Sequence, residues 1–206
     1  MENYQTLGGA ATASITEKKS EFIGNACPAT SEEAALAFLE QIRSQHRTAA
    51  HNVYAYALRH QGRQRYSDDG EPTKTAGLPV LNVLAHSGVV DCIVVVTRYF
   101  GGVLLGTGGL VRAYTAAAKA VLEKAEILTM QQCVTLRLTV GYPLFEPVQR
   151  IMAEAGAHLS PPLFADAVGL SATLPAGLHL PLVEKLNELC RGEANILVSP
   201  PFYAPF

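Results

Sequence analysis

The chain has 206 residues, of which 49% are apolar and 17% are charged, and its formal net charge is −2. This length provides one large or two small domains with buried cores, and the small charge excludes a general electrostatic attraction to nucleic acid or membranes. No apolar run approaches a membrane span, and the first residues lack the apolar centre of a signal peptide, so we expect a soluble cytoplasmic protein.

The four cysteines, Cys27, Cys92, Cys133 and Cys190, are scattered along the chain. No two of them have the short spacing of a zinc-binding motif, and they do not form the pattern of a disulfide framework. We therefore expect no tightly bound metal and no cofactor.

The composition changes near residues 126–133. Nine of the twelve prolines lie from Pro143 onward. Residues 1–130 hold 12 basic and 12 acidic residues, whereas residues 131–206 hold 4 and 6, and the sum gives the net charge of −2. We predict two domains, 1–130 and 131–206.

The first domain shows signals for both helices and strands. Thr30 and Glu33 have the spacing of a capping box, and a helical apolar stripe follows at Leu36, Leu39 and Ile42. The pattern predicts a helix that starts next to Thr30.

Further elements are predicted along the rest of this domain. Asn52–Leu58 alternates loosely and leads, through a turn at Gln61 and Gly62, into a partner strand that carries Arg63 and Arg65. Asp91–Thr97 is a near-continuous β-branched run, typical of a strand covered on both faces. An apolar stripe from Leu110 predicts a helix that runs to about Ala125.

The second domain alternates more clearly. Strands are predicted at Val134–Val140, near His158, at Val168–Leu174 and at Ile196–Val198, and proline-initiated helices begin at Pro143 and Pro181 and end at Gly156 and Gly192. The resulting order, β-α-β-β-α-β, is that of a ferredoxin-like domain.

Residues 94–114 read VVVTRYFGGVLLGTGGLVRAY, with five glycines between a predicted strand and a predicted helix. Glycines at a helix N-terminus let an anion approach free backbone amides, Thr107 is a natural cap, and Arg98 and Arg112 flank the loop. Both phosphate-binding motifs are incomplete, because Gly106 is followed by Thr107-Gly108 without the lysine of the P-loop motif, and Val111 stands where a dinucleotide motif has its third glycine. Two interpretations remain: an anion-binding loop, or small residues that permit tight packing.

The segment from Gln41 to Ser67 is basic. It contains no acidic residue, and it carries five arginines and three histidines: Arg43, Arg47, Arg59, Arg63, Arg65, His46, His51 and His60. Such a cluster either follows a phosphate backbone or is an ordinary surface balanced by acids elsewhere in the fold.

The sequence SDDGEPTK, residues 67–74, is a turn with three carboxylates. Asp68, Asp69 and Glu71 have oxygen ligands that suit Mg²⁺, or they form an acidic loop with Lys74 as counterion. The chain contains no nucleophile elbow and no Cys/His spacing of note, which favours a binding module over an enzyme.

Four motifs, KKSEFIGNACPA, AHNVYAYAL, YSDDGEPTKTAGLPVL and the glycine-rich stretch above, closely resemble the IMPACT family over Lys19 to about Ala125. The resemblance implies an α+β protein with an N-terminal domain similar to the second domain of ribosomal protein S5 and an appended ferredoxin-like domain. Both are similar in fold to adjacent domains of the translocation elongation factor. For eukaryotic members, the resemblance implies translational control through competition for the activator of a stress kinase.

Two functional hypotheses follow. The first is a non-catalytic protein that associates with RNA or the ribosome, or with a protein partner, and that does not bind membranes. Its candidate anion-binding residues are Arg59, Arg63, Arg65, Lys74, Arg98, Gly101, Gly102, Gly106, Thr107, Gly108, Gly109 and Arg112. The alternative is a phosphate- or nucleotide-handling enzyme that uses the glycine loop 101–109 with Asp68, Asp69 and Glu71 as metal ligands.

Overall fold

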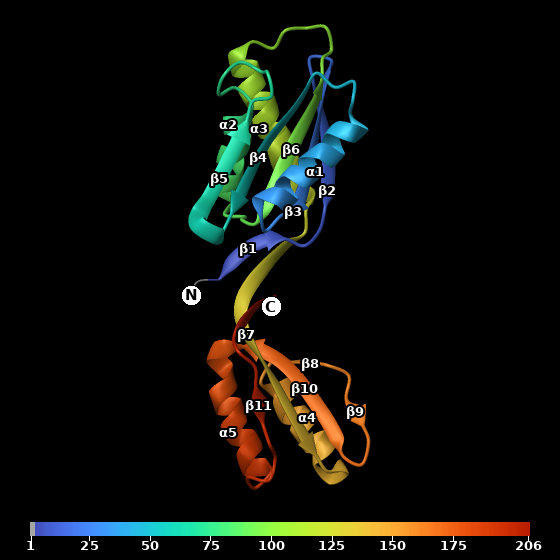
Figure 1. The fold of residues 1–206 in the computed structure, drawn as a ribbon, viewed down its shortest axis with the longest axis vertical. Coiled ribbons are helices and arrows are strands. Elements are labelled where there is room, and N and C mark those ends of the chain that lie inside the picture. The colour runs from blue at the N-terminus through green and yellow to red at the C-terminus, as the bar shows by residue number, and fades with distance from the viewer. Residues whose placement is uncertain (1–2) are drawn as a thin grey trace. The chain divides into compact units, whose positions relative to one another are not determined.

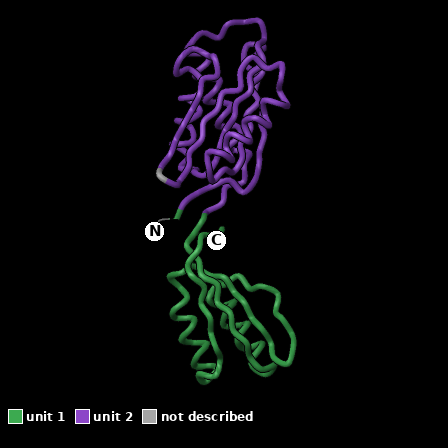
Figure 2. Tube along the Cα trace, viewed as in Figure 1, with its two compact units in different colours: residues 1–3, 130–206 green, residues 4–129 purple. Residues whose placement is uncertain are grey.

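The computed structural model describes residues 3–206 as two compact units, residues 4–129 and residues 130–206 with residue 3 (Figure 2). Each unit combines helices with an antiparallel sheet (Figure 1). The α+β class predicted from the sequence is confirmed.

The unit of residues 4–129 contains a five-stranded antiparallel sheet in the order β2-β3-β6-β4-β5. Its elements are β1 (Tyr4–Leu7), β2 (Ala11–Glu17), β3 (Ser20–Pro28), α1 (Glu32–Gln45), β4 (His51–Leu58), the 3₁₀ turn η1 (His60–Gly62), β5 (Arg63–Ser67), α2 (Gly77–Ser87), β6 (Cys92–Tyr99) and α3 (Thr107–Lys124).

Helices cover both faces of this sheet, with α1 on one side and α2 and α3 on the other (Figure 1). Alternate residues of β6 point to opposite faces: Val94 and Val96 pack in the core beneath α2 and α3, whereas Ile93 and Val95 pack beneath α1. The continuous apolar run of β6 therefore reflects burial on both faces, as the sequence predicts.

Some boundaries in this unit differ from the predictions. The helix α1 is capped by Ser31 instead of Thr30, since Ser31 Oγ accepts a hydrogen bond from the amide of Ala34 at 3.2 Å. The helix α3 begins at Thr107, three residues before the predicted start at Leu110. The helix α2 and strands β1 to β3 have no counterpart among the predicted elements.

The unit from residue 130 is built around the long strand β7, which begins at Ile127. Its elements are β7 (Ile127–Val140), α4 (Tyr142–Glu154), β8 (His158–Leu159), β9 (Leu163–Phe164), β10 (Val168–Pro175), η2 (Ala176–Leu178), α5 (His179–Leu189), β11 (Leu197–Val198) and β12 (Phe202–Pro205). The strand β10 pairs with one edge of β7, and β11 and β12 pair with the other.

Apart from the short strands β9 and β12, the order of this unit is β-α-β-β-α-β, which agrees with the ferredoxin-like prediction. Both helices pack on the same face of the sheet: Val148 and Met152 of α4, with Leu182 and Leu186 of α5, are buried against the alternate apolar residues of β7 and β10. No helix within residues 3–206 is both long and apolar enough to cross a membrane.

Candidate functional site

The acidic loop between β5 and α2 is held by its own side chains. Asp68 Oδ1 accepts hydrogen bonds from the amides of Ala76 and Gly77 at 3.1 and 2.8 Å, and its Oδ2 accepts one from the amide of Lys74 at 2.8 Å. Asp68 thus places a carboxylate at the N-terminus of α2, where the helix dipole favours negative charge.

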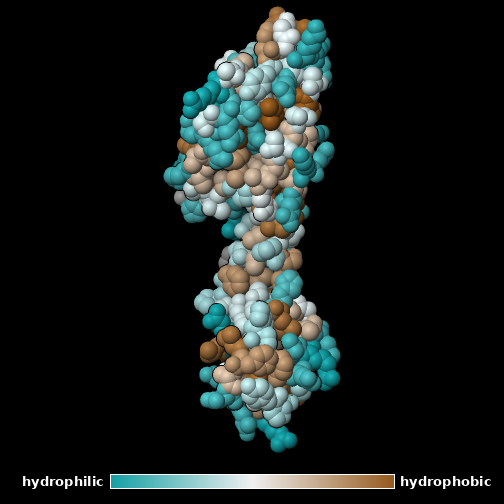
Figure 3. Space-filling view, turned by 90° about the vertical axis from the view of Figure 1, so that its right-hand side faces the viewer, coloured by the Kyte–Doolittle hydropathy of each residue, from teal (hydrophilic) through white to brown (hydrophobic). Residues whose placement is uncertain are grey.

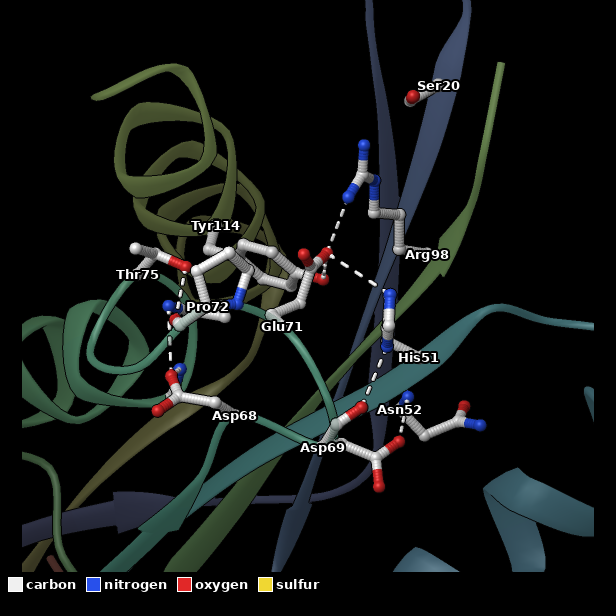
Figure 4. Close-up of polar contacts among 12 residues, drawn as sticks. Ser20, His51, Asn52, Asp68, Asp69, Glu71, Pro72, Thr75, Arg98 and Tyr114 are labelled. Carbon is white, nitrogen blue, oxygen red and sulfur yellow. Dashed lines mark hydrogen bonds and ion pairs between the residues drawn. The ribbon is translucent and has the colours of Figure 1, made fainter. Parts of the chain in front are cut away.

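Asp69 connects this loop to the start of β4 (Figure 4). Its Oδ2 accepts a hydrogen bond from the amide of Asn52 at 2.6 Å, and its Oδ1 accepts one from Arg43 Nη2 at 3.0 Å. His51 Nδ1 donates to the backbone carbonyl of Asp69 at 2.7 Å, because a carbonyl oxygen can only accept.

Glu71 is the centre of a buried polar cluster. Its Oε1 accepts hydrogen bonds from Arg98 Nη1 at 2.6 Å and from the Tyr114 hydroxyl at 2.8 Å, and His51 Nε2 lies 3.8 Å away (Figure 4). Burial, together with the charge of Glu71, raises the pKa of Tyr114 above its usual range, so this hydroxyl stays a donor. The cluster ties the acidic loop to β6 and α3.

The three carboxylates do not converge on one point. Asp68 binds backbone amides, Asp69 binds β4 and α1, and Glu71 binds Arg98 and Tyr114. Within residues 3–206, no group of three or more His, Cys, Asp or Glu residues has the arrangement of a metal site. The geometry therefore does not support Asp68, Asp69 and Glu71 as the ligands of one metal ion.

Gly101, the first glycine of the 101–109 loop, packs against the backbone with no room for a side chain. A Cβ on Gly101 would lie 2.0 Å from the backbone carbonyl carbon of Lys19, and the Gly101 amide donates to Ser20 Oγ at 3.1 Å. Gly109 is also crowded, since its Cβ would lie 2.9 Å from that of Leu105. The crowding at these two positions favours the packing interpretation.

The middle of the loop is open. Gly106 has φ +72° and is the N-cap of α3 without a side-chain cap, so Thr107 is the first helical residue and not the cap that the sequence suggested. A Cβ on Gly108 would meet only Arg112 Nη1, at 3.6 Å. In the described chain, the amides of Thr107, Gly108 and Gly109 donate no hydrogen bond, as is usual for a first helical turn.

A cavity of about 530 Å³ opens at this helix N-terminus. Its polar lining comes from His51, Glu71 and Arg98, and its apolar lining includes Phe100 and Leu104, which are 52% and 82% exposed. The complete lining is Ala50, His51, Glu71, Pro72, Arg98, Phe100, Leu104, Leu105, Gly106, Thr107 and Leu110.

Arg98 and Arg112 differ in their surroundings. Arg98 is 6% exposed, and its Nε is a buried donor without a hydrogen-bond acceptor in the described structure. Arg112 is exposed, and its guanidinium forms no ion pair or hydrogen bond with residues 3–206. Arg112 therefore retains donors for an anion, whereas Arg98 retains only Nη2, because its Nη1 binds Glu71 and its Nε is enclosed.

The arginines of β5 are paired with an acid far away in sequence. Arg63 and Arg65 both form ion pairs with Glu32, the first residue of α1. Hydrogen bonds from Tyr56 and Arg65 hold the pKa of Glu32 below its usual value. Arg59 Nε lies 3.6 Å from Asp91 Oδ2. The alternative of a surface balanced by acids elsewhere applies to these three arginines.

The arginines of β5 and the glycine loop lie at opposite ends of the sheet. His51, at the start of β4, pairs with Arg98, whereas Leu58, at its end, pairs with Arg63. Seven residues of antiparallel strand (58 − 51) span about 24 Å. The hairpin of Arg59 to Arg65 therefore does not extend the surface of the glycine loop.

Several residues of the cavity were not among the predicted site residues. His51 was named only as part of the basic segment, and Phe100 and Leu104 only as part of the glycine-rich motif. Lys74, in contrast, lines a separate groove between α2 and α3. The one signal that could have indicated the cavity is that three of the four family motifs contribute a residue to it.

Comparison with known proteins identifies the family. The model of the Impact N-terminal domain matches residues 18–122. The chain is 37% identical to an IMPACT family member of Thermus thermophilus over 85% of this chain and 96% of the relative. It is 33% identical to YigZ, an IMPACT family member of Escherichia coli, over 96% of this chain and 98% of that relative.

The same similarity extends to a solved structure. A crystal structure of a hypothetical protein is 31% identical to this chain, covers 97% of it and 98% of its own length, and superposes with a TM-score of 0.63. The relatives match both units, and the domain model matches the unit with the cavity. The chain belongs to the IMPACT family.

Proposed function

We propose that this protein is a non-catalytic RNA- or ribosome-associated binding protein linked to the regulation of translation. It contacts RNA through phosphate groups at the N-terminus of α3. The observation that carries the proposal is the combination of free amides at Thr107–Gly109 with two arginines, Arg98 and Arg112, that have unsatisfied donors beside them.

Family membership supports the link to translation. The resemblance stated above implies translational control for eukaryotic members, and the chain shares the domain on which that resemblance rests. A role in translation places the protein in the cytoplasm and gives it RNA-containing particles as partners.

The enzymatic alternative has less support. It needs Asp68, Asp69 and Glu71 to bind a metal together, and each of these carboxylates already accepts hydrogen bonds from a different part of the fold. It also needs a lysine in the phosphate loop, where this sequence has Thr107.

Arg59, before the turn η1, and Arg63 and Arg65 of β5 form a second basic cluster. Glu32 and Asp91 offset most of its charge, so we assign it a smaller share of RNA binding than the α3 N-terminus. Lys74 is a further secondary contact.

The salt dependence of RNA affinity tests the proposal. Phosphate contacts release condensed counterions, so three or four contacts to single-stranded RNA predict a slope of log K against log salt of roughly −2 to −3. The affinity should vary little among base sequences, because phosphates carry no sequence information. Absence of RNA binding at low salt, or an affinity that salt leaves unchanged, would overturn the proposal.

A further inference from the structure

We infer that the cavity at the α3 N-terminus takes one unstacked nucleotide of a single-stranded RNA. The phosphate lies at the α3 amides and Arg98, and the base lies against Phe100. This inference rests on the proposed function and specifies the form of RNA that the site recognises.

Arg98 is an independent indication of an anionic ligand. Its side chain is more than nine-tenths buried and lines the cavity beside Gly106 and Thr107. Its Nη1 binds Glu71, while its buried Nε has no acceptor within the described residues. This Nε is enclosed by the protein, so the donor of Arg98 that a ligand oxygen in the cavity can reach is Nη2, which has no hydrogen bond within the described residues and is not fully buried.

The charge of the cavity suits a single phosphate group. Its ionisable lining consists of Arg98, Glu71 and His51. Glu71 offsets the charge of Arg98, so the positive end that remains in the lining is that of the α3 dipole, and Arg112 adds charge from the first turns of the same helix. A duplex backbone would require a row of unpaired cations, which this cavity does not have.

The apolar side of the cavity suits a base. Phe100 and Leu104 line it, and both are exposed large apolar residues of the β6–α3 connection. Apolar surface also appears at this end of the unit in Figure 3. Unpaired bases stack on exposed aromatic rings, whereas bases in a duplex are not available to them.

Arg98 joins the two sides. Its guanidinium carbon lies 5.6 Å from the centre of the exposed Phe100 ring and 5.4 Å from that of the buried Phe22 ring. Arg98 is therefore close both to the proposed phosphate position and to the ring on which the base would stack. The volume of about 530 Å³ lies within the usual range for small-ligand pockets and is far too small for a duplex.

The experiment measures binding of the full-length protein to a fluorescent ten-nucleotide RNA, single-stranded or as a duplex of the same sequence, by anisotropy. We expect the duplex to bind at least about tenfold more weakly. Phe100→Leu should weaken single-strand binding about fivefold or more, whereas Phe100→Trp retains it because the aromatic surface is kept. Phe202→Leu, at an exposed ring of the other unit, is the matched control and should change nothing.

The outcomes separate the inference from the proposed function. Salt-dependent RNA binding with equal affinity for single strand and duplex, and no effect of Phe100→Leu, would overturn the inference and leave the proposed function intact. No RNA binding by the unmodified protein would overturn both. If a peptide with an apolar residue and a free C-terminal carboxylate bound the cavity in place of RNA, the nucleotide assignment would be wrong.

Discussion

Arg98 and Glu71 form an ion pair inside the protein, with Arg98 Nη1 2.6 Å from Glu71 Oε1 and only 7% and 4% of the two side chains exposed. The pair connects β6 to the acidic loop and fixes Arg98 at the wall of the α3 cavity (Figure 4). The acidic loop therefore supports Arg98.

Glu71→Ala should lower the free energy of unfolding by about 3–5 kcal/mol, because it leaves the buried charge of Arg98 without its partner. Glu40→Ala is the control: Glu40 pairs with Arg43 at the surface and is 68% exposed, and such pairs contribute about 0–1 kcal/mol. Urea unfolding followed by circular dichroism measures both. Equal stabilities of the two variants would contradict the structural role of Glu71.

Gly101→Ala should destabilise the protein by about 1–3 kcal/mol or more, since its Cβ would overlap the backbone at Lys19 and neither segment can move freely. Gly9→Ala is the matched control, because a Cβ at Gly9 meets nothing within 4 Å. Thermal unfolding of the two variants gives the comparison. If both melted like the unmodified protein, the close approach of Gly101 to Lys19 would be disproved.

Alkaline pH should destabilise the protein through Cys92. Burial raises the pKa of the Cys92 thiol from 9.0 to about 12. Between these values the folded state keeps a proton that the unfolded chain has lost, so the free energy of unfolding falls by about 1.4 kcal/mol per pH unit as pH rises. Below pH 9 both states are protonated and the effect vanishes.

Cys92→Ala removes this contribution. Urea unfolding at several pH values from 8 to 10.5 should show a shallower loss of stability in Cys92→Ala than in the unmodified protein. The slope is compared rather than the stability itself, since the substitution also removes buried apolar volume. Identical pH slopes would show that Cys92 is not shielded from solvent.

We propose that the first 129 residues form an independent domain. Both hydrophobic cores of this unit are composed of residues within 4–129, so a chain that ends at Thr129 should fold and unfold cooperatively. Circular dichroism and thermal unfolding of that fragment test the prediction. A fragment that lacks a cooperative transition would show that it depends on the remainder of the chain.

The sequence predicts the elements whose apolar residues follow one regular pattern, either along both faces of a strand or along one stripe of a helix. The β6 run is apolar throughout because both faces are covered, and α4 and α5 begin near prolines and bury one stripe each. In contrast, α2 was missed, because Asp68, nine residues before Gly77, caps it through a tertiary contact, and Pro79 in its first turn weakens the local signal.

The sequence predicts only part of the candidate site. The glycine-rich motif indicates the location of the site, but its glycines have different roles. The backbone of Lys19, which is distant in sequence, leaves no room for a side chain at Gly101, whereas there is room for a Cβ at Gly108. Likewise, a basic segment without acids indicates positive charge, yet Glu32 lies outside that segment and pairs with Arg63 and Arg65. Such pairings depend on strand register, which a single sequence does not specify.

The most direct test of phosphate binding at the α3 N-terminus is the salt slope of single-stranded RNA affinity in three variants. Arg112→Ala should reduce the magnitude of the slope by about 0.7, which corresponds to one lost contact. Gly108→Ala should weaken binding with an unchanged circular dichroism spectrum, because its Cβ fits the fold but obstructs the amides. Lys185→Ala, in the other unit, should match the unmodified protein. If all three variants had the affinity and slope of the unmodified protein, the α3 N-terminus would not be the phosphate site.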